Sequence, residues 1–381
     1  MNMGSGILDI PFLQYGDQDS PEYLWHSVRD LKVIAPPETT YHYNNSIYAL
    51  GGYVGALAQG VPIAGLLDSY TSAMKARIFD PIGMPASAVT DEPQTLSRNL
   101  ATPYVYDLTE DAIPRHPGTF GPVRALAPAA SVATTMNDMS RYLITQLQGG
   151  VTPNGKRIVS ETNLEKTWEG QIEDSPISRY GLGWFDIHID GSRLVSHPGS
   201  IDGFKTEMTM LPSAGIGLLI FSNSDSGSYV EHRMRDWVLL SIGAFQATSL
   251  EDHLEAYEKQ KVFLSSLRRS IVSYKPDCAQ IADFAGGYEK DWIVQYDDDH
   301  RLWLTRDNYY RVPLLLTDDG YLLGGGWDDL TLSSPRAVFV RDGNGSRRMD
   351  LFRVDAGSPV CVALDSVRLI AAKPASCTAA P

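Results

Sequence analysis

The feature that most constrains the fold of this chain is a series of short strand-like segments within residues 180–223. YGLGWFDIHID, RLVSHPG, FKTEMTMLP and GIGLLIFSN are rich in aliphatic, aromatic and β-branched residues, and glycine-rich or polar turns separate them. Such a series predicts antiparallel strands that follow one another across a sheet. The longest apolar run, residues 216–221, is far shorter than the roughly 18 apolar residues of a membrane span and predicts a buried strand.

Helices are predicted around this sheet. Apolar residues at Ile47, Leu50, Val54 and Leu57 have helical spacing, and Gly51-Gly52 mark a point where a neighbour can approach closely. Two more helices are expected, over about 63–79 with its end at Pro81 and within 131–150 with its end at Gly149. The intervening residues 86–126 carry scattered Pro, Thr and Asp and are interpreted as surface loops.

The chain of 381 residues is long enough for two domains. Leu250, Leu254, Tyr257, Leu264 and Ile271 predict an amphipathic helix, after which short alternating strands separated by Asp and Gly turns predict a small β-barrel. We therefore expect an α/β (α+β) domain over 1–248, an antiparallel sheet flanked by helices with a helical lobe. A connecting helix over 249–275 and a barrel domain over 276–381 follow.

The charge balance bears on possible partners. A formal net charge of −14 and the lack of clustered Lys and Arg argue against a nucleic-acid partner. The three cysteines lie late in the chain and form no CxxC pair, and the histidines are scattered, so neither a metal nor a cofactor is expected. The N-terminus has no signal-peptide pattern, which predicts a cytoplasmic, non-membrane protein; the oligomeric state stays open.

Two segments carry candidate chemistry. In HPGSIDGF, residues 197–204, a strand, a turn at Pro198-Gly199 and small residues would bring the Ser200 N–H to a substrate carbonyl. Gly199 lets the main chain approach closely, and His197 would supply a donor or a positive charge. The second segment is Tyr43-Asn44-Asn45, where Tyr can transfer a proton and Asn can hold a polar group.

Each segment also has a purely structural interpretation. Tyr43 would then pack under a loop while the asparagines cap a helix, and His197 would be an ordinary half-buried histidine. Likewise, Trp292, Trp303 and Trp327 are interpreted as core residues of the barrel rather than as a ligand cage.

Several motifs together resemble one family. Tyr43-Asn44-Asn45 looks like a Y-x-N element, IFDPIGM (residues 78–84) is similar to I-F-x-P-L-G-M, and YGLGW opens a recurrent family strand. His197-Pro198-Gly199 falls where relatives have K-T-G or H-x-G. The chain thus resembles the serine β-lactamase-like family of class C β-lactamases, D-Ala-D-Ala carboxypeptidases, related esterases and fungal acyltransferases. The C-terminal strands resemble lipocalin-like barrels.

The resemblance implies acyl transfer from a small ester or amide through an acyl-enzyme. By the same resemblance Tyr43 shuttles a proton, Asn45 holds the substrate or the motif lysine, and His197, Gly199 and Ser200 form the opposite wall. His197 in place of a lysine favours esterase, peptidase or acyltransferase chemistry over β-lactam hydrolysis.

The family's nucleophile is not found at its expected place. Its S-x-x-K motif precedes Y-x-N by many tens of residues, and only 42 residues precede Tyr43. The one S-x-x-K present, Ser72 to Lys75, follows Tyr43 and is interpreted as a chance match on a surface helix. We therefore expect an impaired or inactive enzyme from an incomplete gene model; the alternative is a truncated pseudoenzyme that binds a small molecule or a partner.

Overall fold

The computed structural model places the chain in two compact units. The first comprises residues 1–101, 120–222 and 227–250, and the second comprises residues 102–119, 223–226 and 251–381. The structure describes residues 3–7, 20–31, 33–58, 60–97, 99–106, 112–114, 124–201, 203–224, 227–244, 285–289, 292–296, 302–306, 310–316, 322–324, 335–341, 343–354 and 361–372. The connecting helix expected over 249–275 lies outside these residues.

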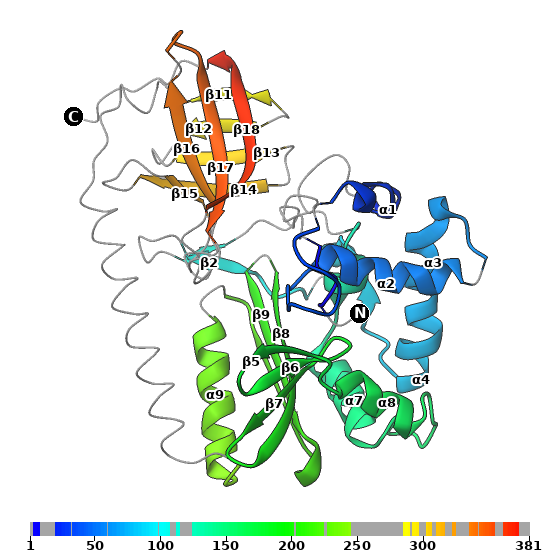
Figure 1. The fold of residues 1–381 in the computed structure, drawn as a ribbon. Coiled ribbons are helices and arrows are strands. Elements are labelled where there is room, and N and C mark those ends of the chain that lie inside the picture. Colours follow the sequence, from blue (N-terminus) through cyan, green and yellow to red (C-terminus); the bar gives the residue numbers. More distant parts are fainter. Residues whose placement is uncertain are drawn as a thin grey trace. The chain divides into compact units, whose positions relative to one another are not determined.

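The first unit is built on the predicted antiparallel sheet. Its six strands lie in the order β10-β9-β8-β7-β6-β5, so each strand pairs with its neighbour in the sequence and the prediction is confirmed (Figure 1). The strands are β5 (Ile172–Ser175), β6 (Ser178–Tyr180), β7 (Phe185–Ile189), β8 (Ser192–Ile201), β9 (Phe204–Leu211) and β10 (Ile216–Ser222).

The turn expected at Pro198-Gly199 is wrong, because β8 continues through both residues to Ile201. Proline is tolerated there because β7 pairs with β8 only as far as Ser196, and beyond that point β8 pairs with β9 alone among the described strands. The turn comes after Ile201, which pairs with Phe204, and Gly203 supplies the positive φ of 84° that the turn requires.

Helices cover both faces of this sheet. α7 (Met136–Leu147) and α8 (Glu161–Trp168) pack Leu143, Leu164 and Trp168 against Val195 and Met210 on one face. On the other face α9 (Gly227–Ser241) packs Leu239 against Leu194 and Leu211 (Figure 1). α7 confirms the helix predicted within 131–150, but α9 was not predicted.

The helical lobe of the same unit surrounds α2 (Asn45–Leu57). The predicted helix is confirmed, but its buried face is wrong: Val54 is 48% exposed, whereas Tyr53 is fully buried and donates its O–H to the Arg124 carbonyl at 2.7 Å. Ala125 and Leu126 are buried beside it, so the surface-loop prediction for 86–126 fails at its end. Tyr53 lies in the centre of the core that surrounds α2, so the buried face of this helix is the one that carries Tyr53 and not Val54.

The helix predicted over 63–79 continues further than expected. α3 (Leu66–Met74) passes through a π-helical turn (Lys75–Phe79) into α4 (Asp80–Ile82), which ends at Gly83 with φ 81°. Pro81 lies just after the π-helical turn, and the helix continues past it to Ile82. The proline therefore does not end the helix.

Shorter elements complete the first unit. They are α1 (Pro21–Ser27), α5 (Pro93–Leu96), α6 (Ala127–Ala130), the paired strands β1 (Ala88–Val89) and β4 (Val132–Ala133), and 3₁₀ turns at Val28–Asp30, Ile63–Gly65 and Pro212–Ala214.

The second unit contains the predicted barrel, which is confirmed as a closed ring of β11 to β18. Trp292 is 1% exposed and Tyr288 2% exposed, in keeping with a core role. A hairpin of β2 (Tyr104–Tyr106) and β3 (Ala112–Pro114) also belongs to this unit. The barrel strands are β11 (Gly286–Tyr288), β12 (Trp292–Tyr296), β13 (Leu302–Arg306), β14 (Tyr310–Leu316), β15 (Leu322–Gly324), β16 (Pro335–Arg341), β17 (Arg347–Val354) and β18 (Cys361–Ala372).

Among the residues that the structure describes, no helix has the length and apolar character needed to cross a bilayer.

Two glycines of α2 give a matched pair of stability predictions. A Cβ on Gly52 would lie 2.5 Å from Cβ of Pro128, whereas a Cβ on Gly55 meets no atom within 4 Å. We expect Gly52→Ala to lower the free energy of unfolding by about 1–3 kcal/mol through overpacking. Gly55→Ala should raise it by about 0.5–1 kcal/mol through helix propensity. Chemical denaturation of both variants measures the difference, and equal effects would contradict the close packing at Gly52.

Candidate active site

Tyr43 and Asn45 stand at the start of α2, where the first described residues of the chain hold them. The buried Asn44 between them accepts a hydrogen bond from the Ile47 N–H at 2.8 Å and donates through Nδ2 to the Ile7 carbonyl at 2.9 Å. The capping interpretation is therefore right for Asn44. The side chain of Tyr43 is 37% exposed.

The opposite wall is the end of β8. Ile201 and Phe204 are the last pair of a hairpin joined by two residues, and such a pair exchanges both main-chain hydrogen bonds. Because main-chain groups of successive residues point to alternate edges, the N–H and C=O of Ser200 point away from β9, toward the edge that β7 leaves open. A substrate carbonyl at this edge can accept the Ser200 N–H.

Gly199 is needed for the close approach of β8 to β9. It pairs with Thr206, and a Cβ on Gly199 would collide with Oγ1 of that threonine. The side chain of Ser200 lies beside that of Lys205 on β9, because its Oγ accepts a hydrogen bond from Nζ of this buried lysine at 2.6 Å.

His197 meets Tyr43 at the centre of the site. Their ring centroids lie 6.3 Å apart, and the ring of Tyr180 lies edge-on to Tyr43 at 6.2 Å. Oη of Tyr180 is 3.0 Å from Nε2 of His197, and the Phe185 ring lies 5.5 Å from the imidazole. The structure thus brings Tyr43 and His197 together from distant parts of the sequence.

Both ring nitrogens of His197 have partners within the protein. Nδ1 lies 2.7 Å from the Pro198 carbonyl and Nε2 faces the Tyr180 hydroxyl. Burial lowers the pKa of His197, although the hydrogen bond to Pro198 and the charge of Glu207 oppose this shift. Burial also raises the pKa of the Tyr180 phenol far above its ordinary value, so Tyr180 keeps its proton.

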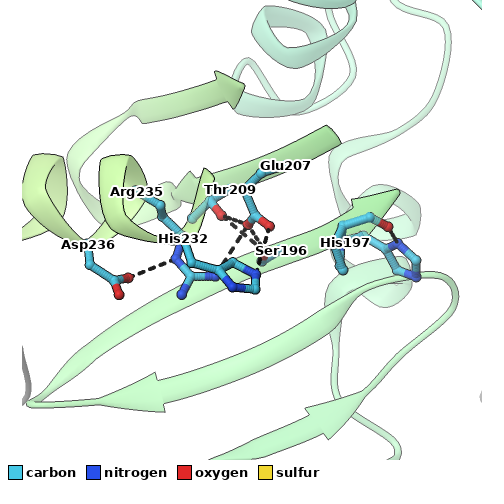
Figure 2. Close-up of polar contacts among 8 residues, drawn as sticks. Ser196, His197, Glu207, Thr209, His232, Arg235 and Asp236 are labelled. Atoms are coloured by element: carbon cyan, nitrogen blue, oxygen red, sulfur yellow. Dashed lines mark hydrogen bonds and ion pairs between the residues drawn. The ribbon is translucent and has the colours of Figure 1, made fainter. Parts of the chain in front are cut away.

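A cluster of polar side chains lies on the α9 side of the sheet (Figure 2). We call it the Glu207 group; its members are Ser196, Glu207, Thr209, His232 and Arg235. Glu207 is 1% exposed and accepts hydrogen bonds from Oγ of Ser196 at 2.7 Å and Oγ1 of Thr209 at 2.5 Å. Nη1 of Arg235 lies 3.5 Å from the carboxylate, and Nε2 of His232 lies 4.0 Å from it. The group ties β8, next to His197, to β9 and α9.

The S-x-x-K sequence of the chain lies on α3 and the π-helical turn. Ser72 is exposed there, and Nζ of the exposed Lys75 pairs with Oδ1 of Asp80 at 2.5 Å. This lysine is engaged by a carboxylate on a surface helix. No group of three or more metal-ligating side chains forms within the described parts of the chain.

The sequence did not identify Tyr180, Thr206 or Glu207 as parts of this region. Tyr180 belongs to YGLGW, which served only as a family motif. Lys205, Glu207 and Thr209 occupy every second position of β9, and polar residues at this period in a strand covered on both faces were the signal for a buried polar group.

Comparison with known proteins gives the following matches. The family model described as Beta-lactamase matches residues 1–241. An unguisins hydrolase of Aspergillus campestris is 25% identical over 207 residues, which cover 53% of this chain and 36% of that protein. Penicillin-binding protein 4 of Amycolatopsis lactamdurans is 24% identical over 193 residues, 49% of this chain and 48% of that protein. The matches therefore span half or less of these relatives' own length.

Among solved structures, the octameric penicillin-binding protein homologue from Pyrococcus abyssi aligns over 97% of this chain and 76% of its own, with a TM-score of 0.53 and 20% identity. A penicillin-binding protein from Bacillus halodurans aligns over 62% of this chain and 70% of its own, with a TM-score of 0.51 and 18% identity. These structures share the fold described above.

Proposed function

This chain belongs to the Beta-lactamase family, and from that membership we propose that it acts on a small ester or amide as an acyl hydrolase or acyltransferase. The names of its relatives support this class of reaction, since an unguisins hydrolase and a penicillin-binding protein are among them. The assignment to this chain rests on the site.

One observation carries the proposal: the phenol ring of Tyr43 and the imidazole of His197 lie 6.3 Å apart beside the open edge of β8. In this arrangement the Ser200 N–H donates to the substrate carbonyl, and Gly199 leaves room for the main chain. Tyr43 transfers a proton to or from the leaving group, Asn45 holds a polar substrate group, and His197 lines the wall.

The nucleophile is not assigned to Ser72. An S-x-x-K serine is activated by a lysine that can take up its proton. Lys75 is instead paired with Asp80 and exposed, on a helix with an exposed Ser72. This observation also favours a second candidate function, in which the cleft binds a small molecule or a partner without turning it over.

Ester hydrolysis by the whole chain distinguishes the two functions. We expect hydrolysis of nitrophenyl butyrate and labelling by a fluorophosphonate, with the labelled serine located by mass spectrometry. Tyr43→Phe should lower kcat/KM by about 10²–10⁴, the usual contribution of a proton-transfer residue. Ser72→Ala is the control and should leave both readouts unchanged.

The opposite results assign the second function. Absent turnover and labelling, with a rise in Tm on adding the ester's product acid or alcohol, would identify a binding protein. Loss of activity in Ser72→Ala would overturn the placement of the site.

A further inference from the structure

Tyr180 contacts His197 but has no role in the proposed chemistry. It is 1% exposed and packs against Met3, Ile172 and Phe185, so its position is fixed by the core. Its hydroxyl nevertheless points at the imidazole, 3.0 Å from Nε2. Phenylalanine would fill this core position equally well, so packing does not account for the hydroxyl group.

The partners of the imidazole determine where its protons lie. The Pro198 carbonyl can only accept a hydrogen bond, so Nδ1, 2.7 Å away, carries a proton. In the neutral ring Nε2 then has a free lone pair, and the Tyr180 O–H donates to it. Both hydrogen bonds of the neutral ring are satisfied by uncharged partners.

We propose that Tyr180 is a positioning residue of the wall: its O–H, donated to Nε2, holds His197 as the neutral, Nδ1-protonated tautomer. The imidazole then presents no positive charge to a substrate.

The surroundings of His197 support a neutral ring. The titratable groups around it are the phenols of Tyr41, Tyr43 and Tyr48 near α2, that of Tyr180 on β6, and the Glu207 and Lys205 side chains on β9. Glu207 and Lys205 pair with Pro198 and Ser200, so both lie on the face of the sheet opposite to His197. There Arg235 is the ion-pair partner of Glu207, and Lys205 donates to Oγ of Ser200. Burial therefore prevails and keeps the pKa of His197 below its ordinary value.

The consequence for substrates rests on the proposed function. A carboxylate placed against the His197 ring would lose its hydration without meeting a positive charge on that ring. The site should therefore prefer acyl donors whose group at this position is neutral.

Nitrogen NMR of the imidazoles tests the tautomer directly. Two-bond ¹H–¹⁵N spectra of the full chain separate Nδ1–H, Nε2–H and doubly protonated rings, and His197→Gln assigns the signals of this one among the eight histidines. We expect the Nδ1–H form in the wild type, with a titration midpoint below the ordinary value of a histidine. An Nε2–H form or a doubly protonated ring at neutral pH would overturn the proposal without any variant of Tyr180.

Tyr180→Phe removes only the hydroxyl and should release the ring. We expect mixed tautomers and a titration midpoint about one pH unit higher, a tenfold gain in proton affinity, because the donated O–H opposes protonation of Nε2. Tyr41→Phe is the matched control: its ring also packs against Tyr180, at 5.8 Å, and the His197 signals should not change. An unchanged His197 spectrum in Tyr180→Phe contradicts the positioning role.

Two esters test the consequence for substrates. We expect nitrophenyl butyrate to be preferred over the nitrophenyl half-ester of succinate, and His197→Lys to raise the relative kcat/KM of the acidic ester by about 10–100-fold, as for a hydrogen bond to a charged group. Equal rates for both esters in the wild type would contradict the neutral wall. If neither ester is hydrolysed, the proposed function fails, while the NMR spectra still decide the role of Tyr180.

Discussion

Glu207→Ala should lower the free energy of unfolding of the first unit by about 3–5 kcal/mol, the range for removal of one partner of a buried ion pair. The carboxylate is 1% exposed, accepts hydrogen bonds from Ser196 and Thr209, and forms an ion pair with Arg235 at 3.5 Å. Its loss leaves two buried hydroxyls with fewer acceptors and an arginine, whose side chain is 16% exposed, without this counter-charge.

Hydrogen exchange in increasing guanidinium, followed by mass spectrometry on peptides from β8 and β9, measures this loss for the first unit separately. Glu207→Gln keeps two acceptor lone pairs and should cost less than the alanine variant. Lys75→Met is the control for an exposed pair and should change stability by no more than about 1 kcal/mol, because water screens the Lys75–Asp80 contact. A Glu207→Ala effect no larger than this control would show that the carboxylate does not hold β8.

Tyr53→Ala is the second change with a large expected effect: it should lower the free energy of unfolding by about 3–5 kcal/mol. The ring is fully buried between α2 and its neighbours and lies 6.0 Å from the Tyr70 ring, so truncation leaves a cavity in the helical core. Denaturation followed by exchange of peptides from α2 measures it.

Tyr53→Phe separates the ring from its hydroxyl. The phenylalanine keeps the packing and loses only the hydrogen bond to the Arg124 carbonyl, at a cost of about 1–2 kcal/mol. If both variants cost the same, the hydroxyl rather than the ring stabilises this core, and the cavity argument is wrong.

The sheet was predictable because its strands show the local pattern that determines them. Alternating apolar residues and turn residues specify neighbouring antiparallel strands without knowledge of the rest of the chain. α9 lacked such a pattern: its buried positions include Glu231 and Asp236, whereas Trp237 is 66% exposed and Met234 50% exposed. Its apolar periodicity therefore points away from the sheet, and only the tertiary structure shows which face is buried.

The same limit applies to the site. Tyr43, Asn45 and His197 could be proposed from residue type and motif. The hydroxyl of Tyr180 and the carboxylate of Glu207 could not, because their importance depends on which atoms strand pairing places within hydrogen-bond distance. The turn expected at Pro198 was wrong for a related reason: a proline at the open edge of a strand breaks no pairing.

The two faces of β8 limit how this protein can change in evolution. Neighbouring residues of the strand serve different surroundings, since Ser196 binds Glu207 while His197 meets Tyr43 and Tyr180. A substitution of one residue in β8 therefore changes the side chains on only one face of the sheet. Loss or gain of a single codon within β8 would shift the register, turning a hydroxyl toward Tyr43 and Tyr180 and an imidazole toward the buried carboxylate. The strand can therefore tolerate exchange of residues but not a change in length.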